Sequence, residues 1–202
     1  MSTFTIIMGP PCSGKTTKIT ELYQYLSERY EQQAMPHTFV MKDGSTQMRD
    51  CGRYFPEINV YLVGHRNKMG NFTGTDAKIN GGVSQDEGDR LFSLHTDKHI
   101  ITETNYSYSP ARKLPVHIAG LGFESTSWVL MHHANKEVLT DRKIKRGIES
   151  GRGHTQKSID EAWGKNAMAD RLHERFVKCA QPQDSIQRYL STDEWDVVSI
   201  LP

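Results

Sequence analysis

One short segment near the start of the chain limits the possible folds more than any other. Residues 9–17 read Gly-Pro-Pro-Cys-Ser-Gly-Lys-Thr-Thr and contain the pattern G-x-x-x-x-G-K-[ST], which is typical of loops that bind phosphate groups. Gly9 and Gly14 have no Cβ atom, so the backbone can turn tightly and bring its N–H groups to phosphate oxygens. Lys15 offers a mobile positive charge, and Thr16 offers a hydroxyl to Mg²⁺. We call this segment the glycine loop and expect all of it to contact a nucleoside triphosphate: Gly9, Pro10, Pro11, Cys12, Ser13, Gly14, Lys15, Thr16 and Thr17.

The segments on either side of the glycine loop supply the structural context that such a loop needs. Thr3–Met8 is an apolar run that predicts a buried strand. After the loop, apolar residues recur at helical spacing, at Ile19, Leu22, Tyr23, Leu26 and Tyr30. A helix beginning here would add its positive N-terminal end to the anion site. The alternative is an ordinary strand-to-helix turn that matches the pattern by chance.

Composition bounds the class of protein. The chain has 202 residues, 36% hydrophobic and 24% charged, with a net charge of +1, which suits a single folded domain. Its three cysteines, Cys12, Cys51 and Cys179, are too few and too scattered for a disulfide framework. No apolar run approaches membrane-spanning length, and the N-terminus leads directly into the first strand. We therefore expect a cytoplasmic protein with no membrane partner.

Apolar runs and capping signals predict alternating strands and helices. Capping boxes at Ser84–Glu87 and Ser158–Glu161 predict helix starts, the second for one long helix that buries Ala162 to Phe176. Strands alternating with helices imply a mainly parallel sheet that is covered on both faces. The candidate strands are Thr3–Met8, His37–Met41, Ile58–Val63, His99–Glu103, Trp128–His132 and, last, Trp195–Ile200.

Two segments together resemble the small P-loop kinases, the group of nucleoside and nucleoside-monophosphate kinases. They are Gly9–Thr17 and Glu137–Arg146, which follows the strand Val129–Met131. No Asn-Lys-x-Asp stretch, which a GTPase would need to read guanine, occurs in the chain. The resemblance implies an α/β fold, the P-loop NTPase three-layer sandwich, with a mainly parallel five-stranded sheet and helices on both faces. It also implies one domain over residues 1–202 with a lid at about 142–157, and ATP and Mg²⁺ as cofactors.

Arginines in the basic stretch Arg142–Lys157 are candidates for closing over the phosphates. By position, Arg142, Arg146 and Arg152 correspond to the lid arginines of that kinase group. Guanidinium groups in such a place stabilise the charge that spreads over the transferred phosphoryl group. The alternative is a basic helix face that is simply solvated.

Three carboxylates are candidates for the chemistry. Asp43 follows a predicted strand, at the edge where ligands bind in open α/β folds, and could accept the proton of the acceptor hydroxyl. Glu103 ends an apolar strand and resembles the Walker-B carboxylate, which would hold Mg²⁺ with Thr16. Asp76 lies in a loop expected to overhang the same edge. Asp43 and Glu103 could instead form turns or cap helices.

Histidine and cysteine side chains do not indicate further chemistry. His132 and His133 lack the ligand spacing of a metal site, so we expect surface or core positions for them. Cys12 lies in a loop where backbone contacts dominate, so we do not expect it to act as a nucleophile.

The acceptor is indicated by a second, shorter resemblance. Tyr61–Gly64 followed by Phe72–Asp76 is similar to kinases of bacteriophages that phosphorylate 5-hydroxymethyluracil in DNA, a step of base hypermodification. The resemblance implies DNA as acceptor and the host cytoplasm as location. Tyr106 and Tyr108 could stack on a flipped base, beside Asp43 and Asp76, or could simply pack in the core.

Two other functions stay open. The acceptor signatures of the housekeeping kinases, Asp-Gly followed by Phe-Pro-Arg or Glu-Arg-Ser, are not in the sequence. A kinase of free nucleosides or nucleoside monophosphates is nevertheless the rival with the same fold. A non-catalytic, regulatory ATP-binding protein is the rival from another class, and Asp43 and Glu103 would then be structural.

Overall fold

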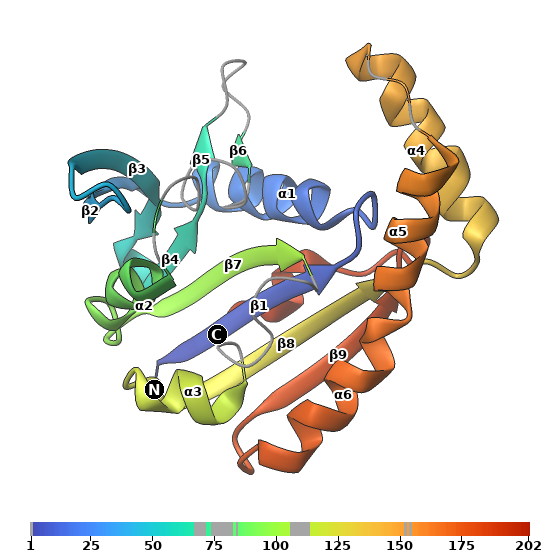
Figure 1. Ribbon diagram of the computed structural model, residues 1–202. Coiled ribbons are helices and arrows are strands. Elements are labelled where there is room, and N and C mark those ends of the chain that lie inside the picture. The colour runs from blue at the N-terminus through green and yellow to red at the C-terminus, as the bar shows by residue number, and fades with distance from the viewer. Residues whose placement is uncertain are drawn as a thin grey trace.

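A computed structural model describes residues 2–66, 72–73, 83, 85–105, 114–151, 153 and 155–202 (Figure 1). Its strands are β1 (Thr3–Gly9), β2 (Gln33–Val40), β3 (Thr46–Phe55), β4 (Val60–Val63), β5 (His65–Arg66), β6 (Phe72–Thr73), β7 (His99–Asn105), β8 (Ser125–His132) and β9 (Ser185–Leu190). Its α-helices are α1 (Lys15–Ser27), α2 (Gln85–Ser93), α3 (Pro115–Gly120), α4 (Lys136–Ser150), α5 (Gln156–Asn166) and α6 (Met168–Cys179), with short 3₁₀ helices η1 (Pro56–Ile58) and η3 (Val197–Ile200).

Within these residues the main sheet has seven strands, in the order β2-β3-β4-β7-β1-β8-β9. The five strands β4, β7, β1, β8 and β9 pair in parallel, whereas β3 is antiparallel to both of its neighbours. The α/β class and the mainly parallel sheet were predicted correctly, but the strand number of five was wrong. The reason is a hairpin, β2–β3, of which only part of β2 was recognised, because the first half of β3 is polar and mostly exposed.

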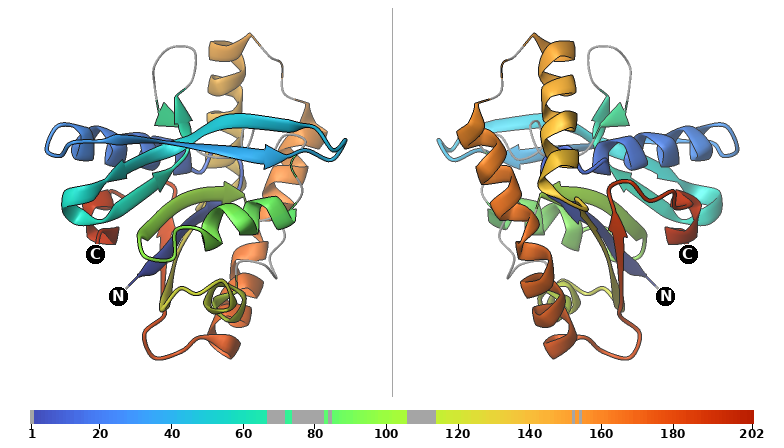
Figure 2. Two further views of the ribbon diagram at one scale, coloured as in Figure 1. Left: turned by 90° about the vertical axis from the view of Figure 1, so that its left-hand side faces the viewer. Right: turned by 90° about the vertical axis from the view of Figure 1, so that its right-hand side faces the viewer.

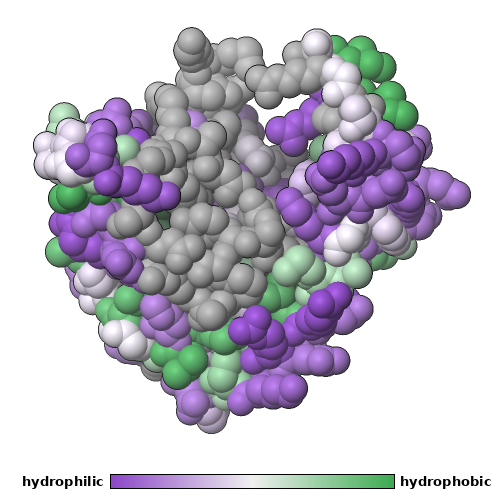
Figure 3. All heavy atoms as spheres, viewed as in Figure 1, coloured by the Kyte–Doolittle hydropathy of each residue, from purple (hydrophilic) through white to green (hydrophobic). Residues whose placement is uncertain are grey.

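Apolar residues of the central strand point alternately to two cores, one on each face of the sheet. Phe4, Ile6 and Met8 face α2, α3 and α6, while Ile7 faces α1 and η3. The edge-on views show helices on both sides of the sheet (Figure 2). Hydrophilic side chains cover the outer side of α6 (Figure 3), whose inner side buries Leu172 and Phe176. The predicted covering of both faces is thus confirmed.

The C-terminal part departs from the predictions in two ways. The expected strand at Trp195–Ile200 is instead the 3₁₀ helix η3, capped by the Asp196 side chain, which accepts a hydrogen bond from Val198 N. The last strand of the sheet is β9, whose half-exposed, mostly polar residues gave no apolar run. The long helix expected after Ser158 is two helices, α5 and α6, separated at Ala167, and Thr155 rather than Ser158 caps the first.

The outer edge of β2 is covered by side chains of α2. Glu87 accepts a hydrogen bond from Val40 N at 2.9 Å, and Arg90 donates one to the Thr38 carbonyl at 2.7 Å. Glu87 and Arg90 also form an ion pair at 2.9 Å. Charged side chains therefore occupy backbone groups on the edge of the sheet that has no neighbouring strand in the described structure.

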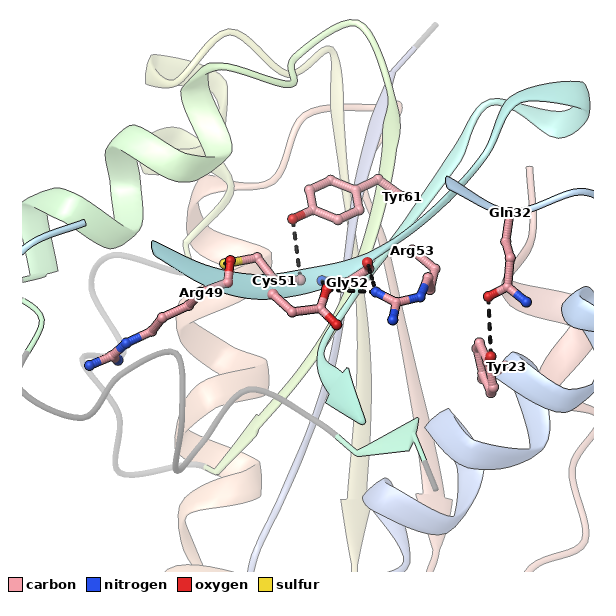
Figure 4. Close-up of polar contacts among 8 residues, drawn as sticks. Tyr23, Gln32, Arg49, Cys51, Gly52, Arg53 and Tyr61 are labelled. Atoms are coloured by element: carbon pink, nitrogen blue, oxygen red, sulfur yellow. Dashed lines mark hydrogen bonds and ion pairs between the residues drawn. The ribbon is translucent and has the colours of Figure 1, made fainter. Parts of the chain in front are cut away.

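A glycine lets β3 change partners along its length. Before Gly52 the strand pairs only with β2, and from Gly52 onward it also pairs with β4. Next to Gly52, the Cys51 carbonyl accepts a hydrogen bond from the Tyr61 hydroxyl at 3.2 Å (Figure 4). It also accepts one from Gly64 N at 3.0 Å. Burial raises the pKa of the Cys51 thiol to about 12, so it stays protonated. Gly52 has φ +146°, and a Cβ added there would lie 2.2 Å from the Leu62 carbonyl oxygen.

Replacing this glycine should destabilise the fold. We expect Gly52→Ala to lower the free energy of unfolding by about 2 kcal/mol or more, because the methyl group would overlap backbone and φ would be strained. Gly44→Ala is the matched control, since Gly44 also has positive φ, of +81°, but no heavy atom of the described residues lies within 4 Å of an added Cβ. Urea unfolding of both variants measures the difference, and equal losses would contradict the steric argument.

Candidate functional site

The glycine loop joins β1 directly to α1. Gly14 is the N-cap of α1 with φ +97°, and Cys12 also has positive φ, at +62°. Gly9 lies against its surroundings so closely that a Cβ would be 2.5 Å from Ser13 Oγ and 2.8 Å from the Met131 carbonyl oxygen. The predicted order of strand, loop and helix is present, and the N-terminal end of a 13-residue helix points at the loop.

A cavity of about 950 Å³ opens over this loop. Among the described residues that line it, lysines and arginines outnumber acids, which favours a polyanionic ligand. The cations are Lys15, Lys18, Arg142, Lys145 and Arg146, and the acids are Glu103, Glu149 and Asp193. The other lining residues are Pro11, Cys12, Gly14, Thr16, Thr17, His65, Met131 and Ser191.

Lys15 is held inside the loop. Its side chain is buried, and Nζ donates a hydrogen bond to the Pro10 carbonyl at 3.0 Å. A buried ammonium group costs free energy unless its donors are bound, so a carbonyl on the same loop keeps the charge in place at the cavity wall.

Thr16 and Glu103 are in contact at the same cavity. The Thr16 hydroxyl lies 2.9 Å and 3.2 Å from the two carboxylate oxygens of Glu103, to which it donates. Glu103 is only 3% exposed and reaches the loop because β7 pairs in parallel beside β1, with Ile7 opposite Glu103. The sequence analysis predicted that Thr16 and Glu103 share one site, and the structure places their side chains in contact.

Two of the three predicted lid arginines line the cavity from α4. Arg142 donates to the Cys12 carbonyl at 3.3 Å and to the Ser191 carbonyl at 2.7 Å. Arg146 lies with Nη1 3.9 Å from Cys12 Sγ. These side chains thus face the loop instead of forming only a solvated surface. Arg152 lies outside the described residues.

Lys143, which belongs to the same basic stretch, has a different place. It is buried, and its Nζ donates to the Ser158 carbonyl, which ties α4 to α5. The two helices stand beyond the carboxyl ends of β1 and β8 in Figure 1, and they form the region where the lid was expected.

His133 is a buried residue behind the loop. Its ring contacts the Pro11 carbonyl and the Ser191 hydroxyl. Burial lowers the pKa of His133, whereas its hydrogen bond to the Pro11 carbonyl raises it. The positive charges of Arg142 and Lys15 act in the same direction as burial, the net shift is downward, and the ring is neutral near pH 7. Of the two positions expected for this histidine, surface or core, the structure shows the core.

Asp43 does not reach the cavity. It lies in the turn between β2 and β3, where its Oδ1 accepts hydrogen bonds from Ser45 N at 3.0 Å and Ser45 Oγ at 2.6 Å. These bonds lower the pKa of Asp43, which makes it a weaker base. The structure therefore shows the alternative role of Asp43, which is to form a turn. Asp76, Tyr106 and Tyr108 lie outside the described residues.

Several lining residues were not predicted. Lys18 and Lys145 each lie three positions from a predicted residue, Lys15 and Arg142, so helical spacing alone could have indicated them. Ser191 and Asp193 follow β9 and were missed because the last strand was placed at Trp195–Ile200. His65, in the short strand β5, carried no recognisable pattern.

No protein-family model matches the chain, and neither does any curated protein. In the described part of the chain, no helix has both the length and the apolar character needed to cross a membrane. The described residues also contain no cluster of three or more His, Cys, Asp or Glu side chains that could hold a metal ion. A cation bound at Thr16 and Glu103 would therefore need further ligands, which phosphate oxygens and water can supply.

The Thr16 hydroxyl should be worth measurable stability. We expect Thr16→Ala to lower the free energy of unfolding by about 1–2 kcal/mol, because the buried Glu103 carboxylate loses a donor. Thr16→Ser keeps the hydroxyl and is the matched control, with a loss under about 0.5 kcal/mol. Urea unfolding at constant pH compares them, and the same loss in both would show that the methyl group, not the hydrogen bond, matters.

Proposed function

We propose that this protein is an ATP- and Mg²⁺-dependent kinase with the fold of the P-loop NTPases. The observation that carries the proposal is the convergence of Lys15, the Thr16–Glu103 pair and Arg142 on one cation-rich cavity. These three features come from α1, β7 and α4, segments that are distant in the sequence. An ordinary strand-to-helix turn would not require them to meet.

Each group has a role in binding the donor. The N–H groups of the glycine loop, the N-terminal end of α1 and Lys15 would bind the β- and γ-phosphates. Arg142 and Arg146 would stabilise the charge on the γ-phosphoryl oxygens as the bond to the β-phosphate breaks. Thr16 and Glu103 offer the oxygen ligands that Mg²⁺ prefers, and the ion would neutralise phosphate charge there.

The reaction would transfer the γ-phosphoryl group to a hydroxyl. The acceptor oxygen forms a bond to the γ-phosphorus, the bond from that phosphorus to the bridging oxygen breaks, and ADP leaves with the electron pair. The hydroxyl proton goes to a base or to solvent. Asp43 is poorly placed for this step, since it is engaged by Ser45 outside the cavity. Of the three predicted carboxylates, Glu103 and Asp76 remain candidates for the base.

The leading acceptor is 5-hydroxymethyluracil in DNA, as a step of base hypermodification in bacteriophages. Its support is the sequence resemblance at Tyr61–Gly64 and Phe72–Asp76, together with a cavity at the upper end of the usual range of about 300–1,000 Å³ for ligand sites. The excess of cations at the cavity suits a DNA backbone as well as ATP, and binding would then weaken as salt rises.

One assay separates the candidate functions. The protein is incubated with γ-labelled ATP and, in turn, with duplex DNA containing 5-hydroxymethyluracil, ordinary DNA, and a panel of nucleosides and monophosphates. We expect label only on the modified DNA. Label on small molecules alone would favour the nucleoside or nucleotide kinase, and no transfer to any of these acceptors would favour the regulatory ATP-binding protein.

Two substitutions then test the assigned roles. Lys15→Ala should lower the transfer rate by at least about 10³-fold, because it removes the charge nearest the phosphates. Asp43→Asn should leave the rate within about twofold, because this side chain lies outside the cavity. Single-turnover transfer of label measures both. Activity retained by Lys15→Ala would overturn the phosphate site, and a large loss in Asp43→Asn would restore Asp43 as the base.

A further inference from the structure

Four hydrogen bonds form a closed ring behind the glycine loop. His133 Nε2 lies 3.0 Å from the Pro11 carbonyl oxygen, and His133 Nδ1 lies 3.0 Å from Ser191 Oγ. Arg142 donates to the Ser191 carbonyl at 2.7 Å and to the Cys12 carbonyl at 3.3 Å. The ring thus begins and ends on two consecutive peptide groups of the loop, and we call it the His133–Ser191–Arg142 ring.

These two peptides flank a strained residue. Cys12 has φ +62°, a conformation that costs a residue with a side chain about 1–2 kcal/mol. Such strain persists only where the surroundings hold the backbone in place. The Pro11 carbonyl belongs to the peptide before Cys12 and the Cys12 carbonyl to the peptide after it, so the ring fixes both neighbours of the strained residue.

Fixing a carbonyl also fixes an N–H group. In a trans peptide the C=O and N–H bonds point in opposite directions, and the described chain has no cis peptide. A Pro11 carbonyl bound to His133 therefore directs the Cys12 N–H away from His133, and a Cys12 carbonyl bound to Arg142 does the same for the Ser13 N–H. Among the described residues, the Ser13 N–H makes only a long contact, 3.4 Å, to the Pro10 carbonyl.

We propose that His133 and Ser191 are positioning residues that hold the Cys12 and Ser13 N–H groups ready for phosphate, an inference that rests on the proposed ATP site. The donor roles in the ring follow from its chemistry. A carbonyl can only accept, so His133 Nε2 carries the hydrogen, and Nδ1 of the neutral ring accepts from the Ser191 hydroxyl. Arg142 supplies the remaining two donors.

Both positioning residues are themselves held firmly. The Asn166 side chain accepts from His133 N at 2.6 Å and donates to the His133 carbonyl at 3.2 Å. Ser191 N donates to the His132 carbonyl at 2.6 Å. His133 is 1% exposed and Ser191 is 8% exposed, so little water can replace a lost bond. Backbone anchoring of this kind makes the ring a rigid support for the loop.

The test measures ATP affinity in the full chain by titration calorimetry. We expect His133→Phe and Ser191→Ala each to weaken ATP binding about 10-fold, and the double variant also about 10-fold, because the ring acts as one unit. Ser191→Thr keeps the hydroxyl and should restore wild-type affinity. His132→Asn changes the adjacent histidine, for which the described structure shows no contact with the loop, and is the matched control.

Circular dichroism melting of each variant separates positioning from general stability. If His133→Phe fails to fold, the ATP affinity of Ser191→Ala alone tests the proposal. Folded variants that melt at lower temperature but bind ATP with wild-type affinity would overturn the positioning role and leave the proposed function intact. A wild-type protein that fails to bind ATP would overturn both proposals.

Discussion

Parallel pairing of β1 with β7 on one side and β8 on the other is the constraint on which the site depends. Parallel strands end at the same edge, so the register that sets Met8 beside Thr104 and Leu130 brings the ends of β7 and β8 to the glycine loop. The glycine loop follows β1 and therefore starts between the ends of β7 and β8. Glu103 then reaches it from the β7 side and His133 from the β8 side, without any long or strained connection. A slip of one residue would exchange the side chains that β1 sends to its two cores.

The loop is therefore supported from two sides by different chemistry. On the β7 side the Glu103 carboxylate accepts a hydrogen bond from the Thr16 hydroxyl. On the β8 side the neutral His133 ring and the Arg142 guanidinium donate hydrogen bonds to loop carbonyls. An anion-binding loop must expose several N–H groups and keep its carbonyl oxygens turned away from the anion. Donors from outside the loop, His133 and Arg142, bind those carbonyls and so keep them turned away from the anion site. Elements remote in the sequence, α4 and the segment after β9, thus contribute to the shape of a loop that looks self-contained in the sequence.

What could be predicted from the sequence was local. The glycine loop is specified by residues within one strand–loop–helix unit, and Glu103 by its place at the end of an apolar strand. The misplaced features depend on long-range partners. Strand β9 is recognisable only through its pairing with β8, and the apolar Trp195–Ile200 run packs against α1 as a 3₁₀ helix. Asp43 follows a strand as predicted, but strand order puts β2 at the outer edge, far along the sheet from β1.

The covered edge of β2 has a consequence for the protein at high concentration. A long outer hairpin would normally offer its free backbone groups to a strand from another molecule, and such additions propagate into aggregates. Here the ion-paired side chains of Glu87 and Arg90 occupy the Val40 N–H and Thr38 carbonyl, and Pro36 has no N–H to offer. The sheet can thus end in the β2–β3 hairpin while the outer edge of β2 remains a poor template for self-association.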